Sequence, residues 1–192
     1  MGDRLFGTQT GLALLANALA TGAGLLVLIS VFGPVSGAHF NPVVTWMALR
    51  KNELLKKEAW WFIGGQIAGG LLGVVAVHAM FAEPLAFSEH SRTGWPQWWS
   101  ELIATFGLLM VILGSARVRP DSTPWLVAAY ITSAYWFTSS TSFANPAVTI
   151  ARTITHTFSG IAPIDAIGFI LAQCTGAWIA FIVCDWLFDH HL

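Results

Sequence analysis

The chain has 192 residues, of which 55% are hydrophobic and only 10% are charged. A typical soluble domain carries about 25% charged residues, so this composition excludes a soluble globule and predicts an all-α membrane protein. The net charge of −1 provides no basic surface, so we expect no nucleic-acid partner. Cys174 and Cys184 lie well apart in one apolar run, so we expect no disulfide, metal site or cofactor.

Five apolar segments predict full transmembrane helices, which need about 20 residues each. In chain order they are Leu12–Phe32, Trp60–Phe81, Trp98–Ala116, Trp125–Ser139 and Ile164–Leu187. Two shorter apolar pieces, starting at Asn41 and Asn145, each open with Asn-Pro and predict re-entrant half-helices. The basic loop after Leu49 favours an orientation with six Lys and Arg residues inside and three outside. We therefore expect one multi-pass domain, residues 1–192, in the plasma (inner) membrane.

The two Asn-Pro pieces belong to an internal repeat. The spacing from Asn41 to Asn145 is nearly the same as the spacing from Gln66 to Gln173, and each glutamine is early in the helix that follows. The repeats cover about residues 1–82 and 97–192, and each holds an odd number of spans, so they insert with opposite orientation. Inverted repeats place a site at the membrane midplane, built from broken helices.

The first repeat is shorter than the second at its N-terminal end. The span Trp98–Ala116, which carries Glu101, precedes the helix that leads to Asn145. Most of its counterpart in the first repeat is expected to fall before Met1, so the first repeat is predicted to be truncated. A misassigned start, a fragment and an unusual five-helix protein all fit this pattern.

The Asn-Pro pairs have a physical explanation as helix starts. Asn at the N-cap satisfies a free backbone N–H group, and Pro fits the first turn because its missing donor is not needed there. Two such N-termini meeting at the midplane create a positive potential that repels cations. Two buried helix caps without a pore are the alternative. The predicted pore motif comprises Asn41, Pro42, Val43, Asn145, Pro146 and Ala147.

Two inverted Asn-Pro motifs on half-helices, the first within SGAHFNP, closely resemble the major intrinsic protein family of aquaporins and aquaglyceroporins. The resemblance covers nearly the whole chain. It implies six full helices and two half-helices around one pore per subunit, a homotetramer, and passive flow of water or small neutral solutes through the membrane. An intramembrane enzyme is not favoured, because no span holds a convincing nucleophile with its base or a set of metal ligands.

The resemblance also locates a selectivity filter by spacing from the two asparagines. The four positions are Thr21, Ser133 (with a latitude of one or two residues), Ser142 and Val148. Val148 stands where the family normally has Arg, and Thr21 where relatives often have an aromatic residue, so we expect a wide, non-aromatic filter.

Stretches such as LLANALATGAG and AYWFTSSTSFANPAVTIAR are similar to aquaglyceroporin-like channels linked to bacterial arsenic resistance. This similarity implies neutral metalloids such as arsenite, and methylated arsenicals, as substrates. An ordinary water or glycerol channel and a non-conducting truncated subunit are the alternatives.

Five further side chains are candidates for supporting roles. Arg152 shares a helical face with Asn145 and Val148 and is predicted to guard the outer vestibule, with a snorkelling surface Arg as the alternative. Glu101 lies well inside a span, and the resemblance implies that it holds carbonyl groups of the pore loop. Loop bracing is expected of Gln66, Gln173 and His39 as well.

Overall fold

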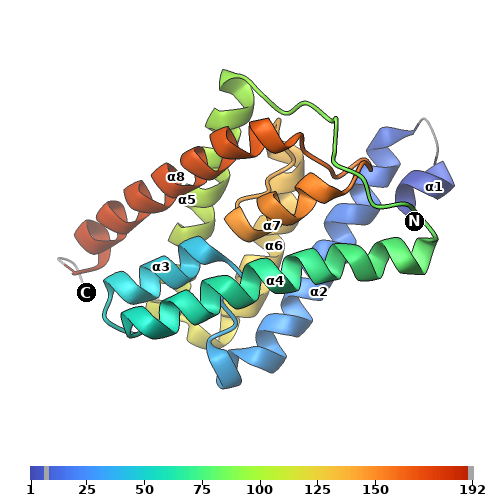
Figure 1. Cartoon of the computed structure of the whole chain (residues 1–192). Helices are drawn as coiled ribbons and strands as arrows, with labels where there is room; N and C mark the ends of the chain where they lie inside the picture. Colours follow the sequence, from blue (N-terminus) through green and yellow to red (C-terminus); the bar gives the residue numbers. More distant parts are fainter. Residues whose placement is uncertain (7–8, 190–192) are drawn as a thin grey trace.

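The computed structural model describes residues 1–6 and 9–189, and the secondary structure of these residues is entirely helical. The longer helices are α2 (Thr10–Ser36), α4 (Lys56–Phe81), α5 (Trp95–Val118), α6 (Thr123–Phe137) and α8 (Pro163–Asp189). The shorter ones are α1 (Gly2–Phe6), η1 (Pro120–Ser122), α3 (Pro42–Arg50), α7 (Pro146–Ala151) and η2 (Arg152–Ile154). The succession of a long helix, a short helix and a long helix in α2–α3–α4 recurs in α6–α7–α8 (Figure 1).

Four of the five expected spans are helices long and apolar enough to cross a bilayer, namely α2, α4, α5 and α8. The fifth, α6, has 15 residues, which is about 22 Å at 1.5 Å per residue and short of the roughly 30 Å apolar core. The 3₁₀ turn η1 directly precedes α6. After Phe137 the chain leaves the helix as the serine-rich pore loop, so the C-terminal part of the predicted segment Trp125–Ser139 is loop rather than helix.

The helix α2 ends later than its sequence suggests. We expected it to stop at Phe32, before the cluster that begins with Gly33 and Pro34, but it continues to Ser36. A proline in the last turn removes a single backbone donor, which is a smaller loss than in a helix interior. Gly37 then ends the helix with φ of 74°, a left-handed conformation that glycine adopts without steric cost.

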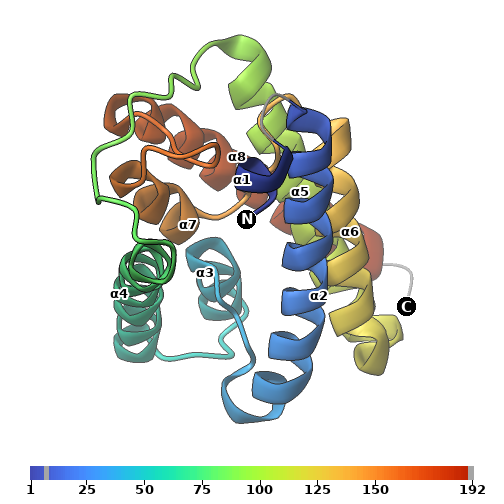
Figure 2. The same cartoon turned by 90° about the vertical axis from the view of Figure 1, so that its right-hand side faces the viewer.

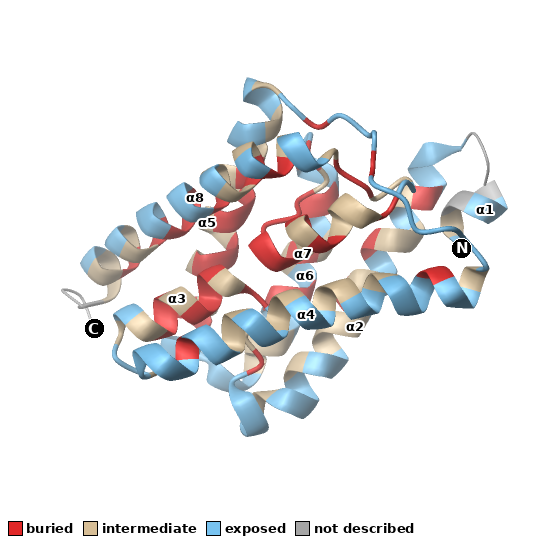
Figure 3. Cartoon of the chain, viewed as in Figure 1, coloured by how far each residue is buried: buried red, intermediate tan, exposed pale blue. Residues whose placement is uncertain are grey.

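The long helices enclose the two short ones. Helix α5 packs along α8, α2 packs along α6, and α4 packs against α7 and α3, an arrangement visible in two views (Figures 1 and 2). The largest buried cluster lies where α3, α5, α6 and α8 meet. Residues of α4 and the outer side of α8 are mostly exposed (Figure 3), as expected of surfaces that face lipid.

Candidate functional site

Each Asn-Pro motif starts a short helix in the predicted manner. Asn41 is the N-cap of α3, and its Oδ1 accepts a hydrogen bond from the Val43 amide at 3.2 Å. Asn145 is the N-cap of α7, and its Oδ1 accepts from the amides of Ala147 at 2.9 Å and Val148 at 3.3 Å. Each proline occupies the first helical turn, where its missing N–H is not needed.

The two asparagines also join the repeats to each other. Asn41 Nδ2 donates to the carbonyl of Ala144 at 2.8 Å, and Asn145 Nδ2 donates to the carbonyl of Phe40 at 2.8 Å. Each side-chain amide has two hydrogens, and one hydrogen of each forms this link. The asparagines are therefore helix caps and links between the repeats at the same time.

The loops before the two asparagines share an unusual backbone. Ala38 and Phe40 have φ of 48° and 47°, and their counterparts in the second repeat, Ser142 and Ala144, have φ of 51° and 47°. Left-handed conformations of residues other than glycine cost about 1–3 kcal/mol each and persist only where the surroundings impose them. The two repeats therefore share this strained loop geometry as well as their sequence motifs.

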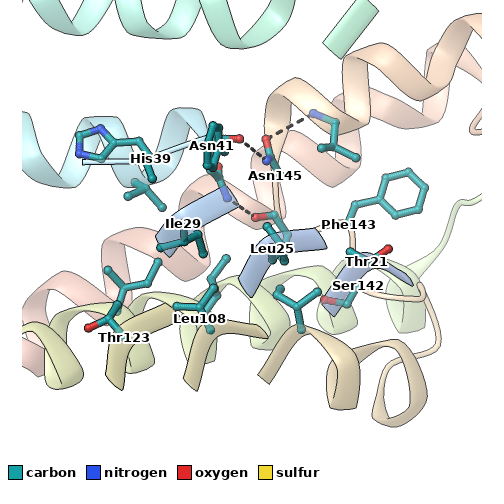
Figure 4. Close-up of a pocket in the computed structure, with 18 of the residues that line it drawn as sticks. Thr21, Leu25, Ile29, His39, Asn41, Leu108, Thr123, Ser142, Phe143 and Asn145 are labelled. Carbon is teal, nitrogen blue, oxygen red and sulfur yellow. Dashed lines mark hydrogen bonds between the residues drawn. The ribbon is translucent and has the colours of Figure 1, made fainter. Parts of the chain in front are cut away.

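The two loops face a cavity of about 200 Å³. Figure 4 shows Asn41 and Asn145 opposite each other, with Thr21, Ser142 and Phe143 toward one end and Thr123 toward the other. One set of lining residues is apolar and comes mainly from the long helices: Leu25, Ile29, Val44, Leu108, Ile112, Val127 and Ile131. The polar lining comprises Thr21, His39, Asn41, Thr123, Tyr135, Ser142, Asn145 and Arg152.

Three of the four predicted filter residues line this cavity, namely Thr21, Ser142 and Val148. Ser133, predicted with a latitude of one or two residues, is not among the residues that line the cavity: its side chain is exposed and its Oγ donates to the Tyr130 carbonyl within α6. Tyr135, two residues further along α6, lines the cavity instead. Its hydroxyl lies 3.2 Å from Thr21 Oγ1. The spacing from Asn145 left a latitude of one or two residues at this position, and the rotation of α6 decides which residue enters the cavity.

Arg152 lies in the wall of the cavity together with Asn145 and Val148, as their shared helical face predicted. Its guanidinium lies 4.2 Å from the centre of the Phe143 ring and donates to the Tyr135 hydroxyl at 3.4 Å. Both interactions hold the guanidinium of this half-buried side chain against the cavity wall. Tyr135 and Phe143 also line the cavity, so aromatic side chains lie close to the predicted filter positions.

Glu101 is fully buried under the second pore loop. Its carboxylate accepts hydrogen bonds from Ser140 Oγ at 2.5 Å, from the amides of Phe143 and Ala144 at 2.8 Å each, and from Gln173 Nε2 at 2.7 Å. Four donors occupy both oxygens, as an ionised carboxylate requires. The predicted contact with loop carbonyls is wrong, because a carboxylate accepts hydrogen bonds and therefore binds N–H groups.

The two glutamines occupy equivalent places. Gln173 Nε2 donates to Thr149 Oγ1 at 2.9 Å, and Gln66 Nε2 donates to Thr45 Oγ1 at 2.8 Å. Each therefore ties a long helix to the short helix of its own repeat. His39 contacts the same threonine, with Nδ1 3.2 Å from Thr45 Oγ1, and it also lines the cavity.

A buried arginine, Arg92, was not anticipated. It belongs to the connection between α4 and α5, and it donates to the carbonyls of Gly160, Ser140 and Phe158 at 2.8, 3.3 and 3.0 Å. Its guanidinium also lies 5.1 Å from the centre of the Phe143 ring. Burial lowers the pKa of Arg92 to about 10, with the charge of Arg152 as a smaller cause, so Arg92 is a cation at neutral pH. The sequence does not single out Arg92, because it lies in the polar stretch between two predicted spans, where an exposed arginine is expected.

The chain is similar to known membrane channels. Residues 5–138 match the family described as Major intrinsic protein. The chain is 49% identical to Aquaglyceroporin AqpS of Rhizobium meliloti over 177 residues, which are 92% of the chain and 76% of that protein. It is 31% identical to Aquaporin-B of Dictyostelium discoideum over 165 residues, 80% of the chain and 52% of that protein. It is 30% identical to human Aquaporin-5 over 122 residues, 59% of the chain and 46% of that protein.

The inverted pair of Asn-Pro helices, the cavity between them and these similarities agree with one another. Proteins of this kind are multi-pass membrane channels rather than enzymes. The chain belongs to the major intrinsic protein family and is a channel for small solutes.

Proposed function

We propose that the chain is a passive channel for small neutral solutes, with arsenite and methylated arsenicals as substrates beside glycerol-like molecules. The observation that carries this proposal is Val148, an uncharged side chain in the cavity wall three residues after Asn145. An arginine at this place would narrow the passage and compete for the polar groups around it. Valine leaves room there for solutes bulkier than water.

The polar groups of the cavity suit a solute rich in hydroxyls. Thr21 and Tyr135 present hydroxyl groups to the space. The Oγ of Ser142 is buried and has no hydrogen-bond partner among the described residues. A buried hydroxyl without a partner costs about 1–3 kcal/mol, which a passing solute would relieve. Uncharged arsenite, a trihydroxide, and glycerol both supply several hydroxyls to such a site.

The cavity also discriminates by charge. Arg152 lies half-buried in its wall, and a fixed positive charge there disfavours the entry of cations. We propose that Arg152, together with the N-termini of α3 and α7, keeps the flow restricted to neutral solutes. The name of the bacterial relative, an aquaglyceroporin, supports solutes larger than water.

By resemblance to its family, we also propose that the chain acts as a homotetramer in the plasma (inner) membrane. By the same resemblance, each subunit then holds its own pore. An ordinary water and glycerol channel and a non-conducting truncated subunit remain the competing proposals, and the following experiment separates them.

The test is stopped-flow swelling and solute uptake by liposomes that contain the purified chain, with water, glycerol and arsenite. Val148→Arg is the test variant, and Val118→Arg, at the exposed end of α5, is the control with the same added charge. We expect Val148→Arg to lower arsenite and glycerol uptake about tenfold, equivalent to about 1.4 kcal/mol, with little change for Val118→Arg. Flux of water and glycerol without arsenite would contradict the metalloid proposal. Absence of any flux would support the non-conducting subunit.

A further inference from the structure

A polar pocket separate from the pore cavity lies where the C-terminal ends of α3, α5 and α8 come together. It has a volume of about 360 Å³, which is within the range of roughly 300–1,000 Å³ that is usual for small-ligand sites. Its lining residues are Arg50, Lys51, Glu53, Arg117, Phe181 and Asp185. None of these residues lines the cavity between the two asparagines, so passage of a solute through that cavity does not explain the pocket.

The basic side chains of this pocket offer donors to an anion. Arg50 is exposed, and its guanidinium lies 5.7 Å from the centre of the Trp178 ring and 5.6 Å from that of the Phe181 ring. Neither Arg50 nor Lys51 forms an ion pair or a side-chain hydrogen bond with another described side chain. A guanidinium has five N–H donors in a planar fork that matches the oxygens of a phosphate. The pocket therefore holds a preferred phosphate-binding group whose donors are not used within the protein.

The acidic side chains add acceptors to the same lining. Glu53 and Asp185 face the pocket together with three basic residues, so the lining has one excess positive charge. A carboxylate accepts hydrogen bonds from hydroxyl groups. A ligand with a single negative charge and neighbouring hydroxyls would satisfy both kinds of side chain. A phosphodiester that carries a glycerol head has this chemistry.

An aromatic surface continues from the pocket along the membrane-spanning part of α8. Trp178, Phe181 and Asp185 are spaced by three and four residues and so share one face of the helix. Trp178 lies seven residues before Asp185, which is about 10 Å along the helix axis. The Trp46 ring of α3 joins this surface, with its centre 5.6 Å from that of Trp178 and 6.4 Å from that of Phe181. Trp178 is 44% exposed, so the aromatic surface is open to a lipid chain.

The same face of α8 remains exposed further from the pocket. Cys174 and Leu171 continue the spacing of Trp178, and both are exposed, in agreement with the exposed outer side of α8 in Figure 3. Leu171 precedes Asp185 by 14 residues, about 21 Å along the axis. One leaflet contributes half of the roughly 30 Å apolar core. The exposed stripe is therefore long enough to accompany an acyl chain through one leaflet.

We propose that the pocket binds the headgroup of a phosphatidylglycerol-type phospholipid, with an acyl chain along Trp178 and the stripe beyond it. Arg50 and Lys51 bind the phosphate, and the glycerol hydroxyls donate to Glu53 and Asp185. A soluble anion would fill the pocket but leave the aromatic surface uncovered, whereas a phospholipid covers both. The basic loop places this end of the bundle at the inner leaflet, where anionic lipids attract basic residues at the membrane surface.

The site adjoins the pore through the half-helix α3. Arg50 is the last residue of α3, and Asn41, the N-cap of the same helix, lines the pore cavity. Helix α3 has nine residues, and helices of this length are marginal without packing partners. A lipid that connects the end of α3 to α8 therefore stabilises the half-helix that presents Asn41.

The test measures quenching of tryptophan fluorescence by phospholipids with brominated acyl chains, in bilayers of unbrominated phosphatidylcholine. The chain has ten tryptophans, so the Trp178 signal is the difference between each protein and its Trp178→Phe partner. We expect brominated phosphatidylglycerol to bind at Trp178 about tenfold more strongly than brominated phosphatidylcholine, which corresponds to about 1.4 kcal/mol. Equal binding of the two lipids would overturn the proposal.

Paired charge variants locate the preference. The double variant Arg50→Gln with Lys51→Gln removes two charges from the pocket. The control, Lys56→Gln with Lys57→Gln, removes two exposed charges from the start of α4, outside the pocket lining. We expect the pocket variant to reduce the preference to about twofold or less, and the control to keep most of it. Equal losses in both would assign the preference to general surface charge and overturn the proposal. If the pocket variant does not fold, Lys51→Gln against Lys57→Gln gives the same comparison.

Two further observations distinguish the occupant. Excess inorganic phosphate should leave the Trp178 signal as it is with chloride at equal ionic strength, whereas displacement of the lipid would make this a site for soluble anions. Absence of quenching by either lipid would show that protein, such as a second copy, covers Trp178. Both contrary results overturn the proposal.

Thermal unfolding in detergent tests the effect on α3. Added phosphatidylglycerol should raise the unfolding midpoint of the unmodified chain by about 3 °C, and it should raise that of the pocket variant by half of this or less. An equal shift in both proteins, or no shift in either, would overturn the stabilising role of the lipid.

Discussion

The guanidinium of Arg152 donates a hydrogen bond to the hydroxyl of Tyr135 across the cavity, at 3.4 Å. The two residues lie on different elements, η2 and α6, and both line the pore cavity. The Tyr135 hydroxyl also reaches Thr21 Oγ1 on α2. A bridge of three side chains from three elements therefore spans one end of the cavity. It places a positive charge close to the position that Val148 leaves neutral.

Removing the charge of Arg152 should open the pore to cations. In Arg152→Gln a polar side chain remains but the electrostatic barrier is lost, so we expect conductance to sodium ions or protons to rise about tenfold, which corresponds to about 1.4 kcal/mol. The measurement is ion flux into liposomes. Arg119→Gln, an exposed arginine after α5, serves as control. Conductance equal to that of the unmodified chain would place the barrier elsewhere.

The hydroxyl of Tyr135 should control the passage of larger solutes. Tyr135→Phe keeps the ring but removes the bridge between Thr21 and Arg152, and a single hydrogen bond contributes about 0.5–1.5 kcal/mol. We expect glycerol permeability to rise by a factor of about 2 to 10, with a smaller change for water. Tyr130→Phe is the matched control, because the Tyr130 hydroxyl donates to the Ala104 carbonyl and lies outside the cavity lining. An equal response of both variants would argue against a bridge that controls passage.

Glu101 should stabilise the second pore loop. Glu101→Gln replaces an acceptor of four hydrogen bonds by a group that accepts at one atom and turns a donor toward the amides of Phe143 and Ala144. Leaving buried donors unsatisfied costs about 1–3 kcal/mol each, so we expect a loss of about 2–4 kcal/mol in the free energy of unfolding. Denaturant unfolding in detergent measures it, with the exposed Glu53→Gln as control. A loss below about 1 kcal/mol would contradict the bracing role.

Arg92 should hold the connection between α4 and α5 over the second pore loop. Its guanidinium binds three carbonyls in different directions, and a lysine ammonium cannot match this planar fork. We expect Arg92→Lys to lower the free energy of unfolding by about 1–3 kcal/mol and to speed hydrogen exchange in residues 156–162. Exchange rates and unfolding free energy that match the unmodified chain would show that the connection is held by other contacts.

The motif residues of the site could be predicted because their roles are local. Asn41 and Asn145 cap helices whose first turns follow them directly in the sequence, so the residue types alone indicate the geometry. The equivalence of Gln66 and Gln173 likewise follows from a constant spacing, and their bonds to Thr45 and Thr149 agree with it. The prediction that Asn145, Val148 and Arg152 share one helical face required only the period of a helix.

The filter position on α6 could be predicted only to within one or two residues of Ser133. Spacing placed it at Ser133, yet Ser133 bonds within its own helix and Tyr135 enters the cavity. Which face of α6 turns inward depends on its packing against α2 and α5 and on the loop after Phe137. The buried site of Arg92 is set in the same way, because the carbonyls it binds belong to segments that are distant from it in the chain.

The sequence by itself determined the membrane class, the inverted repeat and the two capped half-helices, because composition, spacing and N-cap chemistry act over short stretches of chain. Only the tertiary structure decided that Tyr135 and Arg152 form a hydrogen bond at the cavity and that Glu101 binds amides rather than carbonyls. These features depend on the rotation and contact of helices that are distant in sequence.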